Sequence, residues 1–335
     1  MAGPRSFDPI SIVERSYALQ GTEREWIDRL VEAVAPAIGD GIVVYGFTYR
    51  WHGRDPQPAV FATGKPAWEH LVRVIAADYI AATVGTPKPC NTYSQQVAKL
   101  PSHMHGLDDK FFRPNGFVDV LGVHAFDPDG GLFLVSGLAE KRTLSARDTA
   151  RWRRITAHMS TALRLRRRFE REAVEHDEAV LSPSGRLLHA TGQAQESDAR
   201  DRLRAAARAM DRARGPLRRS DPQEAIELWR ALCNGRWSLV DRFESDGRRY
   251  VIAHPNEPSL LDLRGLSQRE ATVAAFAQLG QANKEIAYAL GISASSVATY
   301  LASALRKLGL SSRAALAATS FGQRVEKAGD HFCTR

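Results

Sequence analysis

The spacing of apolar and polar residues over the first 143 positions predicts a mixed α/β domain. Apolar side chains at helical spacing alternate with runs rich in β-branched and aromatic residues, which are typical of strands. The predicted helices cover 10–37 and 67–82, and the predicted strands cover 41–51, 117–126 and 132–140. Between them, Pro56, Pro58, Gly64 and Pro66 predict a loop. The last two strands are predicted to form a hairpin, since Gly130 and Gly131 tolerate positive φ.

A long helix is predicted next, and it separates the first domain from the rest of the chain (144–176). Ser145 can cap its free amides, and Asp148 suits the positive helix end. A narrow apolar stripe runs along it: Trp152, Ile155, Met159, Ala162 and Phe169, with Arg166 breaking the series. Such a stripe has two interpretations, packing on its own domain or a dimer seam. The sequence leaves both open.

Residues 177–256 predict a second, smaller α+β module. A strand, a tight turn and a strand cover 179–190, and a second hairpin covers 237–253. Between the hairpins, apolar spacing predicts helices over 198–213 and 222–233. The element order resembles a PAS-like module, as the order in 1–143 with its closing helix resembles a GAF-type sensor domain.

The GAF resemblance implies a pocket between the sheet and its covering helices. Five residues of the first domain are candidates to line such a ligand pocket: Tyr45, Phe47, Trp68, Tyr79 and His124. The alternative is that these side chains simply fill the core, where aromatic residues are common.

The C-terminal part, 257–335, predicts a helix-turn-helix. Ser267 and Glu270 form a capping box, and the first helix stops at Gly280. A short helix over 283–290 ends at Gly291, and Ser293 caps the following helix. A short helix, a three-residue turn and a second helix are the arrangement that enters the major groove, which is roughly 12 Å wide.

The segment 264–320 closely resembles the LuxR-type (GerE, NarL-like) DNA-binding domain. The matching motifs are LSQRE at 266–270, NKEIA at 283–287, GIS at 291–293, SV at 296–297 and KLG at 307–309. The resemblance implies contacts to DNA phosphates or base edges from eight residues: Asn283, Lys284, Ser295, Ser296, Thr299, Tyr300, Arg306 and Lys307.

Three positions depart from the family pattern. The family usually has lysine and histidine where this chain has Ala298 and Tyr300, so a contact to phosphate or guanine is lost. Ala282 stands where a capping hydroxyl is common, which leaves Asn283 either as the cap or as a phosphate ligand. The departures keep open an adaptor that has the fold without specific DNA binding.

Net charge does not by itself support DNA binding by the C-terminal segment. The chain carries +8 and has a pI near 9.6. Eleven basic and two acidic residues lie between Lys141 and Arg171, which leaves +9 in that stretch. The rest of the chain is therefore close to neutral, and the DNA-binding prediction depends on the pattern of residues.

Other features predict a cytoplasmic protein without cofactor, metal or catalytic site. The three cysteines lie far apart, no apolar run reaches about 18 residues, and the N-terminus lacks the apolar core of a secretory signal. His103 and His105 with Asp108 and Asp109 could bind a metal, but a solvated loop is favoured. No nucleotide-binding glycine pattern occurs.

Together these features predict an α+β multidomain transcription regulator. Its expected partners are double-stranded DNA, a small ligand of the N-terminal domain, a second copy of the chain and RNA polymerase, with no membrane. An enzyme fused to a DNA-binding domain is the other alternative, and it predicts a buried polar constellation in the first domain.

Overall fold

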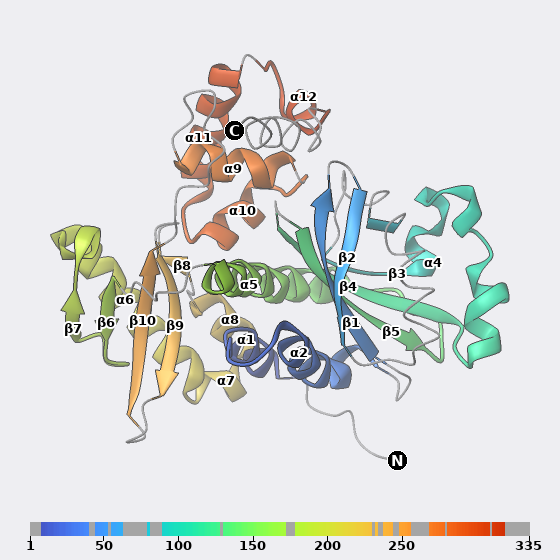
Figure 1. The fold of residues 1–335 in the computed structure, drawn as a ribbon, viewed down its shortest axis with the longest axis horizontal. Coiled ribbons are helices and arrows are strands. Elements are labelled where there is room, and N and C mark those ends of the chain that lie inside the picture. Colours follow the sequence, from blue (N-terminus) through green and yellow to red (C-terminus); the bar gives the residue numbers. More distant parts are fainter. Residues whose placement is uncertain are drawn as a thin grey trace, which may run out of the picture.

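A long central helix separates two antiparallel sheets, and the C-terminal helices lie along one side of it (Figure 1). The structure is a computed structural model. It describes residues 8–39, 44–52, 55–62, 79–80, 89–127, 130–171, 178–229, 232–233, 237–243, 248–255, 268–278, 280–308 and 310–318. The fold class predicted from the sequence, mixed α and β with an all-helical C-terminal domain, is confirmed.

The first predicted helix is in fact two helices, α1 (Pro9–Ser16) and α2 (Glu23–Ile38). Each has its own N-cap: Asp8 accepts from backbone amides of α1, and Thr22 forms a capping box with Glu25. Gly21 between the helices has a φ of 81°, which a glycine adopts without strain. The prediction of one continuous helix over 10–37 was wrong, because apolar spacing continues across the break.

The first sheet contains five strands in the order β2-β1-β5-β4-β3. Their bounds are β1 Val44–His52, β2 Asp55–Ala62, β3 Cys90–Thr92, β4 Asp119–Asp127 and β5 Gly130–Leu138. The predicted loop at Pro56 and Pro58 is instead the edge strand β2, paired with β1 across a register shift. Proline is tolerated there because an edge strand leaves one row of amides without sheet partners. Gly64 and Pro66 lie outside the described residues.

The connection between β3 and β4 is helical but irregular. It begins with α4 (Tyr93–Gln96) and continues as short 3-10 and π turns up to Asn115. These turns pack an aromatic cluster of their own, in which Tyr93, Phe112 and Phe117 are buried.

Helix α5 (Ala146–Arg171) begins as the sequence predicts, since the Ser145 hydroxyl accepts a hydrogen bond from the Asp148 amide at 3.1 Å. The chain itself buries the apolar stripe, with Trp152, Ile155, Met159 and Ala162 each at most 5% exposed. Arg166, which interrupts the stripe, is also buried and donates to the carbonyls of Leu19 and Gly21. Of the two interpretations of the stripe, the structure therefore shows packing within the chain.

A second five-stranded sheet lies at the other end of α5, in the order β7-β6-β10-β9-β8. Its strands are β6 Ala179–Leu181, β7 Leu187–Ala190, β8 Leu232–Cys233, β9 Trp237–Phe243 and β10 Arg249–Pro255. Its helices are α6 (Ser197–Arg214), α7 (Leu217–Ser220) and α8 (Pro222–Leu228). The predicted helix over 222–233 was wrong at its end, because residues 232–233 pair with β9.

The two sheets have the same connectivity. In each, the strands lie in the order second, first, fifth, fourth, third, counted along their own segment of chain. All the pairings are antiparallel in both. The sequence shows no repeat that would predict this duplication.

One hydrophobic core runs from α1 and α2 through α5 into the second sheet, and it includes Trp26, Met159, Leu203 and Trp237. Half-buried charges join the same parts. Arg214 pairs with Glu14 at 2.8 Å and also with Asp241, and desolvation raises the pKa of the Asp241 carboxyl. The predicted boundaries at 143/144 and 176/177 therefore divide segments that share a core.

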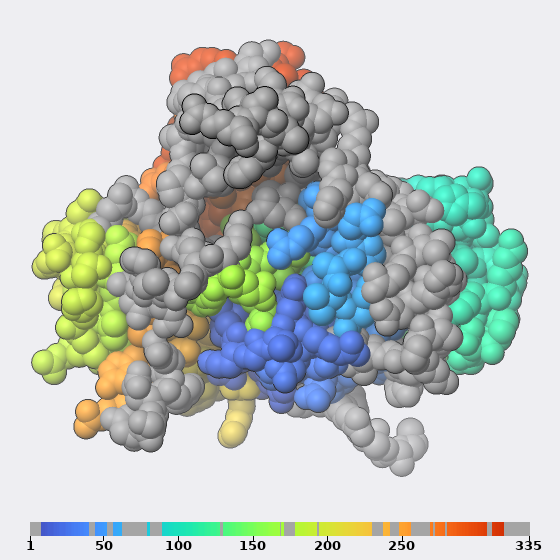
Figure 2. Space-filling model, viewed as in Figure 1, coloured from blue at the N-terminus to red at the C-terminus, as the bar shows by residue number. Residues whose placement is uncertain are grey.

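The C-terminal domain has a separate core built from α9 (Gln268–Gln278), α10 (Asn283–Leu290), α11 (Ala294–Leu308) and α12 (Arg313–Ala318). Figure 2 shows these helices standing above α1 and α2, with a green band of α5 visible between them. Within the described residues, no single helix is long and apolar enough to cross a membrane. The pair α10 and α11 passes that test together but is bent by 107°.

Candidate nucleic-acid interface

Helices α10 and α11 form a helix-turn-helix with a bend of 107°. Helix α10 ends at Gly291, whose backbone is in the left-handed region with φ of 63°. Helix α11 begins after Ser293, whose hydroxyl accepts a hydrogen bond from the Ser296 amide at 3.0 Å. Buried Ile286 and Val297 fix the angle between the two helices. The bend lies within the roughly 90–120° typical of this motif.

The outer face of α11 is exposed and carries small side chains. Ser295, Ala298, Thr299 and Arg306 are exposed, so three of the predicted DNA contacts share this face. The Thr299 hydroxyl donates to the Ser295 carbonyl at 3.0 Å, which leaves its lone pairs as acceptors. Among the side chains that the structure describes on this face, only Arg306 is charged.

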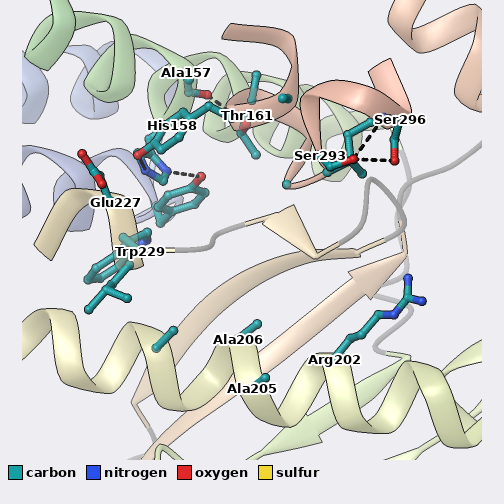
Figure 3. Close-up of a pocket in the computed structure, with 18 residues that line it drawn as sticks. Ala157, His158, Thr161, Arg202, Ala205, Ala206, Glu227, Trp229, Ser293 and Ser296 are labelled. Carbon is teal, nitrogen blue, oxygen red and sulfur yellow. Dashed lines mark hydrogen bonds between the residues drawn. The ribbon is translucent and has the colours of Figure 1, made fainter. Parts of the chain in front are cut away.

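Ser296 and Tyr300 lie at the sides of α11 and are half-buried. Ser296 shares its hydroxyl with Ser293 at 2.8 Å, as Figure 3 shows. The Tyr300 hydroxyl accepts from Arg269 of α9 at 2.7 Å, and the Arg269 guanidinium lies 5.8 Å from the Tyr300 ring centre. Tyr300 therefore links α9 to α11. The Lys307 side chain is outside the described residues.

The start of α10 shows that Asn283 is not its cap. Ala282 is the N-cap, and its amide donates to the Glu285 carboxylate at 2.7 Å. Asn283 is the first residue of the helix, and its side-chain oxygen accepts from Arg313 at 2.9 Å. Asn283 is thus not the cap, and the capping alternative was wrong. Lys284 beside it is exposed.

The opposite side of α10 is docked on α5. Glu285 pairs with Arg153 of α5 at 2.5 Å, and Ala157 of α5 packs against the core of the C-terminal domain. Arg164 lies 5.2 Å from the ring centre of Phe276 in α9 and pairs with the buried Asp127 carboxylate at 2.9 Å. Part of the arginine-rich charge of α5 is therefore neutralised inside the molecule.

A chain of hydrogen bonds crosses this junction. The hydroxyl oxygen of Tyr17, the C-cap of α1, lies 3.2 Å from Nδ1 of His158, and the hydroxyl oxygen of Tyr288 in α10 lies 3.0 Å from its Nε2. Tyr288 donates its one hydroxyl proton to the Ile226 carbonyl at 2.9 Å. His158 must therefore donate from Nε2, and its Nδ1 accepts from Tyr17.

That assignment requires a neutral imidazole. Burial lowers the pKa of His158 to about 3, so the ring is uncharged near neutral pH. Burial also raises the pKa values of Tyr17 and Tyr288, which keep their protons. Four segments that are far apart in sequence thus meet in an uncharged, hydrogen-bonded chain.

Comparison with known proteins identifies the C-terminal segment. Residues 264–320 match the family described as bacterial regulatory proteins, luxR family. These residues form a LuxR-family domain. The resemblance inferred from the sequence motifs is confirmed, and the match indicates a transcription regulator rather than an enzyme. No curated protein sequence matches the chain.

Three solved structures match the whole chain or half of it, with low sequence identity and low TM-scores. Escherichia coli SdiA in space group P6522 is 13% identical, with coverage of 92% of this chain and 94% of that chain and a TM-score of 0.36. SdiA in complex with octanoyl-rac-glycerol is 14% identical, with 95% of each chain covered and a TM-score of 0.30. The phycoerythrobilin-bound GAF domain of a cyanobacterial phytochrome is 15% identical, with coverage of 50% of this chain and all of that chain and a TM-score of 0.34. Similarities of this size carry no argument about ligands.

Four of the five predicted ligand-pocket residues gather on one face of the first sheet. Phe47, Tyr79 and His124 each contact the Phe133 ring, at centre distances of 4.8–5.6 Å, and Tyr45 packs against the same cluster. His124 also bonds to the Tyr49 hydroxyl at 3.0 Å, and burial holds its pKa well below the usual value. Trp68 lies outside the described residues.

His103 and His105, for which the sequence favours a solvated loop over a metal site, lie in the connection between β3 and β4. The His105 Nε2 lies 2.9 Å from the Leu100 carbonyl, as in a structured loop. Within the part of the chain that the structure describes, histidine, cysteine and carboxylate side chains form no group of three that could hold a metal ion.

Proposed function

We propose that the protein is a cytoplasmic transcription regulator that binds specific sites in double-stranded DNA through its LuxR-family domain. The observation that carries the proposal is the family match over 264–320, combined with the exposed outer face of α11. Ser295 and Thr299 would contact base edges or phosphates, and Lys284 and Arg306 would contact phosphates. Asn283, Ser296, Tyr300 and Lys307 complete the proposed interface.

The outer face of α11 carries small, mostly uncharged side chains, so we expect a single domain to bind DNA weakly. Ala298 contributes no hydrogen bond, and Tyr300 is engaged with Arg269. A single domain therefore makes few phosphate contacts, and each contributes about −0.9 to the slope of log K against log salt. We propose that two copies bind paired half-sites about one helical turn apart, which doubles these contacts. The apolar stripe of α5 is not available for that dimer, since the chain buries it.

The N-terminal segments are proposed to regulate this domain. We propose a GAF-like sensor at 1–143, a connecting helix at 144–176, a PAS-like module at 177–256 and the DNA-binding domain at 257–335. The shared strand order of the two sheets supports the view that both modules are variants of one sensor-like plan. RNA polymerase is proposed as the partner on DNA.

The test is selection from a randomised DNA pool by the full chain, with sequencing of the bound fraction. An enriched, roughly palindromic motif is expected. Lys284→Ala should weaken binding to all sequences, whereas Thr299→Ala should relax preference at one position of the motif. Lys99→Ala removes an exposed lysine far from the interface and is the matched control. No enrichment at low salt would refute the proposal and favour the adaptor alternative.

A further inference from the structure

The outer face of α11 carries two parallel rows of small side chains. One row consists of methyl groups, from the three exposed residues Ala294, Ala298 and Ala302. The other row consists of hydroxyls, from Ser295, Thr299 and Ser303, of which only the last is half-buried. Residues four apart lie on the same face of a helix, so the members of each row follow one another at about 6 Å along the axis.

This face lacks the long polar side chains that usually read bases in the major groove. From 294 to 305 the sequence contains no lysine, arginine, asparagine, glutamine, aspartate or glutamate. Arginine or lysine is the usual bidentate partner of guanine, and asparagine or glutamine is that of adenine. Tyr300 lies at the side of the helix and is engaged with Arg269. If α11 reads bases, it does so with methyl groups and short hydroxyls.

Thymine offers the apolar group that such a face can recognise. In the major groove both kinds of base pair present two acceptors and one donor, and only A·T adds a methyl group. Base pairs follow one another at about 3.4 Å, so the spacing of about 6 Å between the alanine methyls corresponds to about two base-pair steps. The row of three methyls therefore spans about four base pairs.

The Thr299 hydroxyl favours the same base pair. It donates its single proton to the Ser295 carbonyl at 3.0 Å, so toward DNA it can only accept. The adenine amino group is a donor in the major groove, and the paired thymine brings its methyl group to the same groove. One A·T pair can thus satisfy the hydroxyl of Thr299 and the neighbouring methyl of Ala298 together.

We infer that α11 reads the methyl groups of thymine, and that the DNA half-site is a run of about four base pairs rich in A·T. The alanine row contacts successive thymine methyls, and Thr299 accepts from an adenine amino group beside them. The inference rests on the proposed function, since it names the DNA that the proposed interface binds. Ala298, where the family usually has lysine, is then a specificity determinant, because a lysine side chain would cover the centre of the methyl row.

The test compares three randomised double-stranded DNA pools, each selected with the full chain. The first contains the four natural bases, the second has deoxyuridine in place of thymidine, and the third has 5-methylcytosine in place of cytosine. Deoxyuridine lacks only the 5-methyl group, and 5-methylcytosine carries that group at the same place in the groove. The first pool should enrich an A·T-rich motif, and the second should lose it. In the third, pairs of guanine with 5-methylcytosine should replace part of the A·T pairs.

Single substitutions in the enriched duplex then measure each contact. Deoxyuridine at a contacted thymine should weaken binding about fourfold, or about 0.8 kcal/mol for one buried methyl group, and at a thymine outside the motif it should change nothing. Ala298→Lys should remove the fourfold effect at one position and favour guanine there. Gln20→Lys is the control: it adds the same charge at an exposed position between α1 and α2, across α5 from the C-terminal helices (Figure 1), and should preserve the effect.

The outcomes separate this inference from the proposed function. A motif and an affinity that are the same in thymine and deoxyuridine DNA would overturn the inference alone, as would a G·C-rich motif from the first pool. No enrichment in any of the three pools would refute the proposed function, and this inference with it. Ala298 and Gln20 are both exposed, so both variants should keep the fold.

Discussion

Replacing Tyr288 by phenylalanine should loosen the docking of the LuxR-family domain without unfolding it. The substitution keeps the ring that packs at the junction and removes one hydroxyl. That hydroxyl accepts from His158 at 3.0 Å and donates to the Ile226 carbonyl at 2.9 Å. Both bonds cross from α10 to other parts of the chain, so the docked state alone loses them.

The magnitude follows from what remains after the change. His158 is 5% exposed, and its Nε2 proton would have no acceptor in the docked state. A buried donor without a partner costs about 1–3 kcal/mol, whereas in the undocked state water can reach both groups. Because every 1.4 kcal/mol is about tenfold, the undocked population should rise roughly 5- to 150-fold.

Thiol labelling under native conditions can measure this population. Ala289 and Ala274 are both 5% exposed, and both belong to the core of the C-terminal domain. Ala289 also lines a small cavity with Ala157 and Ser160 of α5, so undocking uncovers a thiol at position 289. A thiol at position 274 instead reports unfolding of the domain. Peptide mass spectrometry separates these positions from the native cysteines.

Tyr288→Phe should accelerate labelling at 289 by roughly 5- to 150-fold and leave labelling at 274 unchanged. Tyr300→Phe is the matched control, because its hydroxyl contacts Arg269 within the C-terminal domain. Equal rates at 289 in the wild type and in Tyr288→Phe would refute the hydrogen-bonded chain as a docking contact. Equal acceleration at both thiols would mean that the domain unfolds instead.

Three further predictions concern pH, charge and backbone. Docking should weaken as pH falls below 6.5, because the pKa of His158 is about 3 when docked and returns toward 6.5 on undocking. From pH 7.5 to 5 the loss is about 2 kcal/mol, so labelling at 289, divided by the rate of a free thiol at the same pH, should rise about thirtyfold, and His158→Gln should abolish that rise. Glu14→Gln should lower the free energy of unfolding in urea by about 1–3 kcal/mol, because Arg214 and Arg218 both lose a half-buried ion-pair partner. The control Glu32→Gln, at an exposed ion pair, should change it by less than about 0.5 kcal/mol, and equal effects of the two variants would contradict a stabilising role of the Glu14 ion pairs. Gly130→Ala should lower the melting temperature more than Gly116→Ala, because a Cβ at position 130 meets the Tyr49 carbonyl whereas a Cβ at position 116 meets open space. A larger decrease for Gly116→Ala would contradict the backbone geometry of the β4–β5 hairpin at Gly130.

The helix-turn-helix could be predicted from the sequence because its determinants are local. Ser293 and Gly291 set the ends of the helices through their own amides and φ angles, and the apolar residues between them have helical spacing. The bounds predicted for α10 match the structure. The same local rules located the hairpin of β4 and β5 and the start of α5 at Ser145.

Errors arose where local signals conflict with tertiary context. Pro56 and Pro58 predict a loop, and only their place on the edge of the sheet makes β2 compatible with them. Helical spacing continues through Gly21, although each helix has its own cap. At 232–233 two residues join a strand because β9 offers them partners.

The sequence by itself therefore determined the helix-turn-helix and most of the element types in the two preceding modules. Only the tertiary structure decided that both sheets share one strand order and that α5 buries its stripe within the chain. It also decided that His158, Tyr17 and Tyr288 meet at the docking surface. Caps, turns and periodicity involve neighbours within a few residues, whereas these contacts join groups up to 141 residues apart. Their formation depends on how the modules pack, and no local pattern encodes that packing.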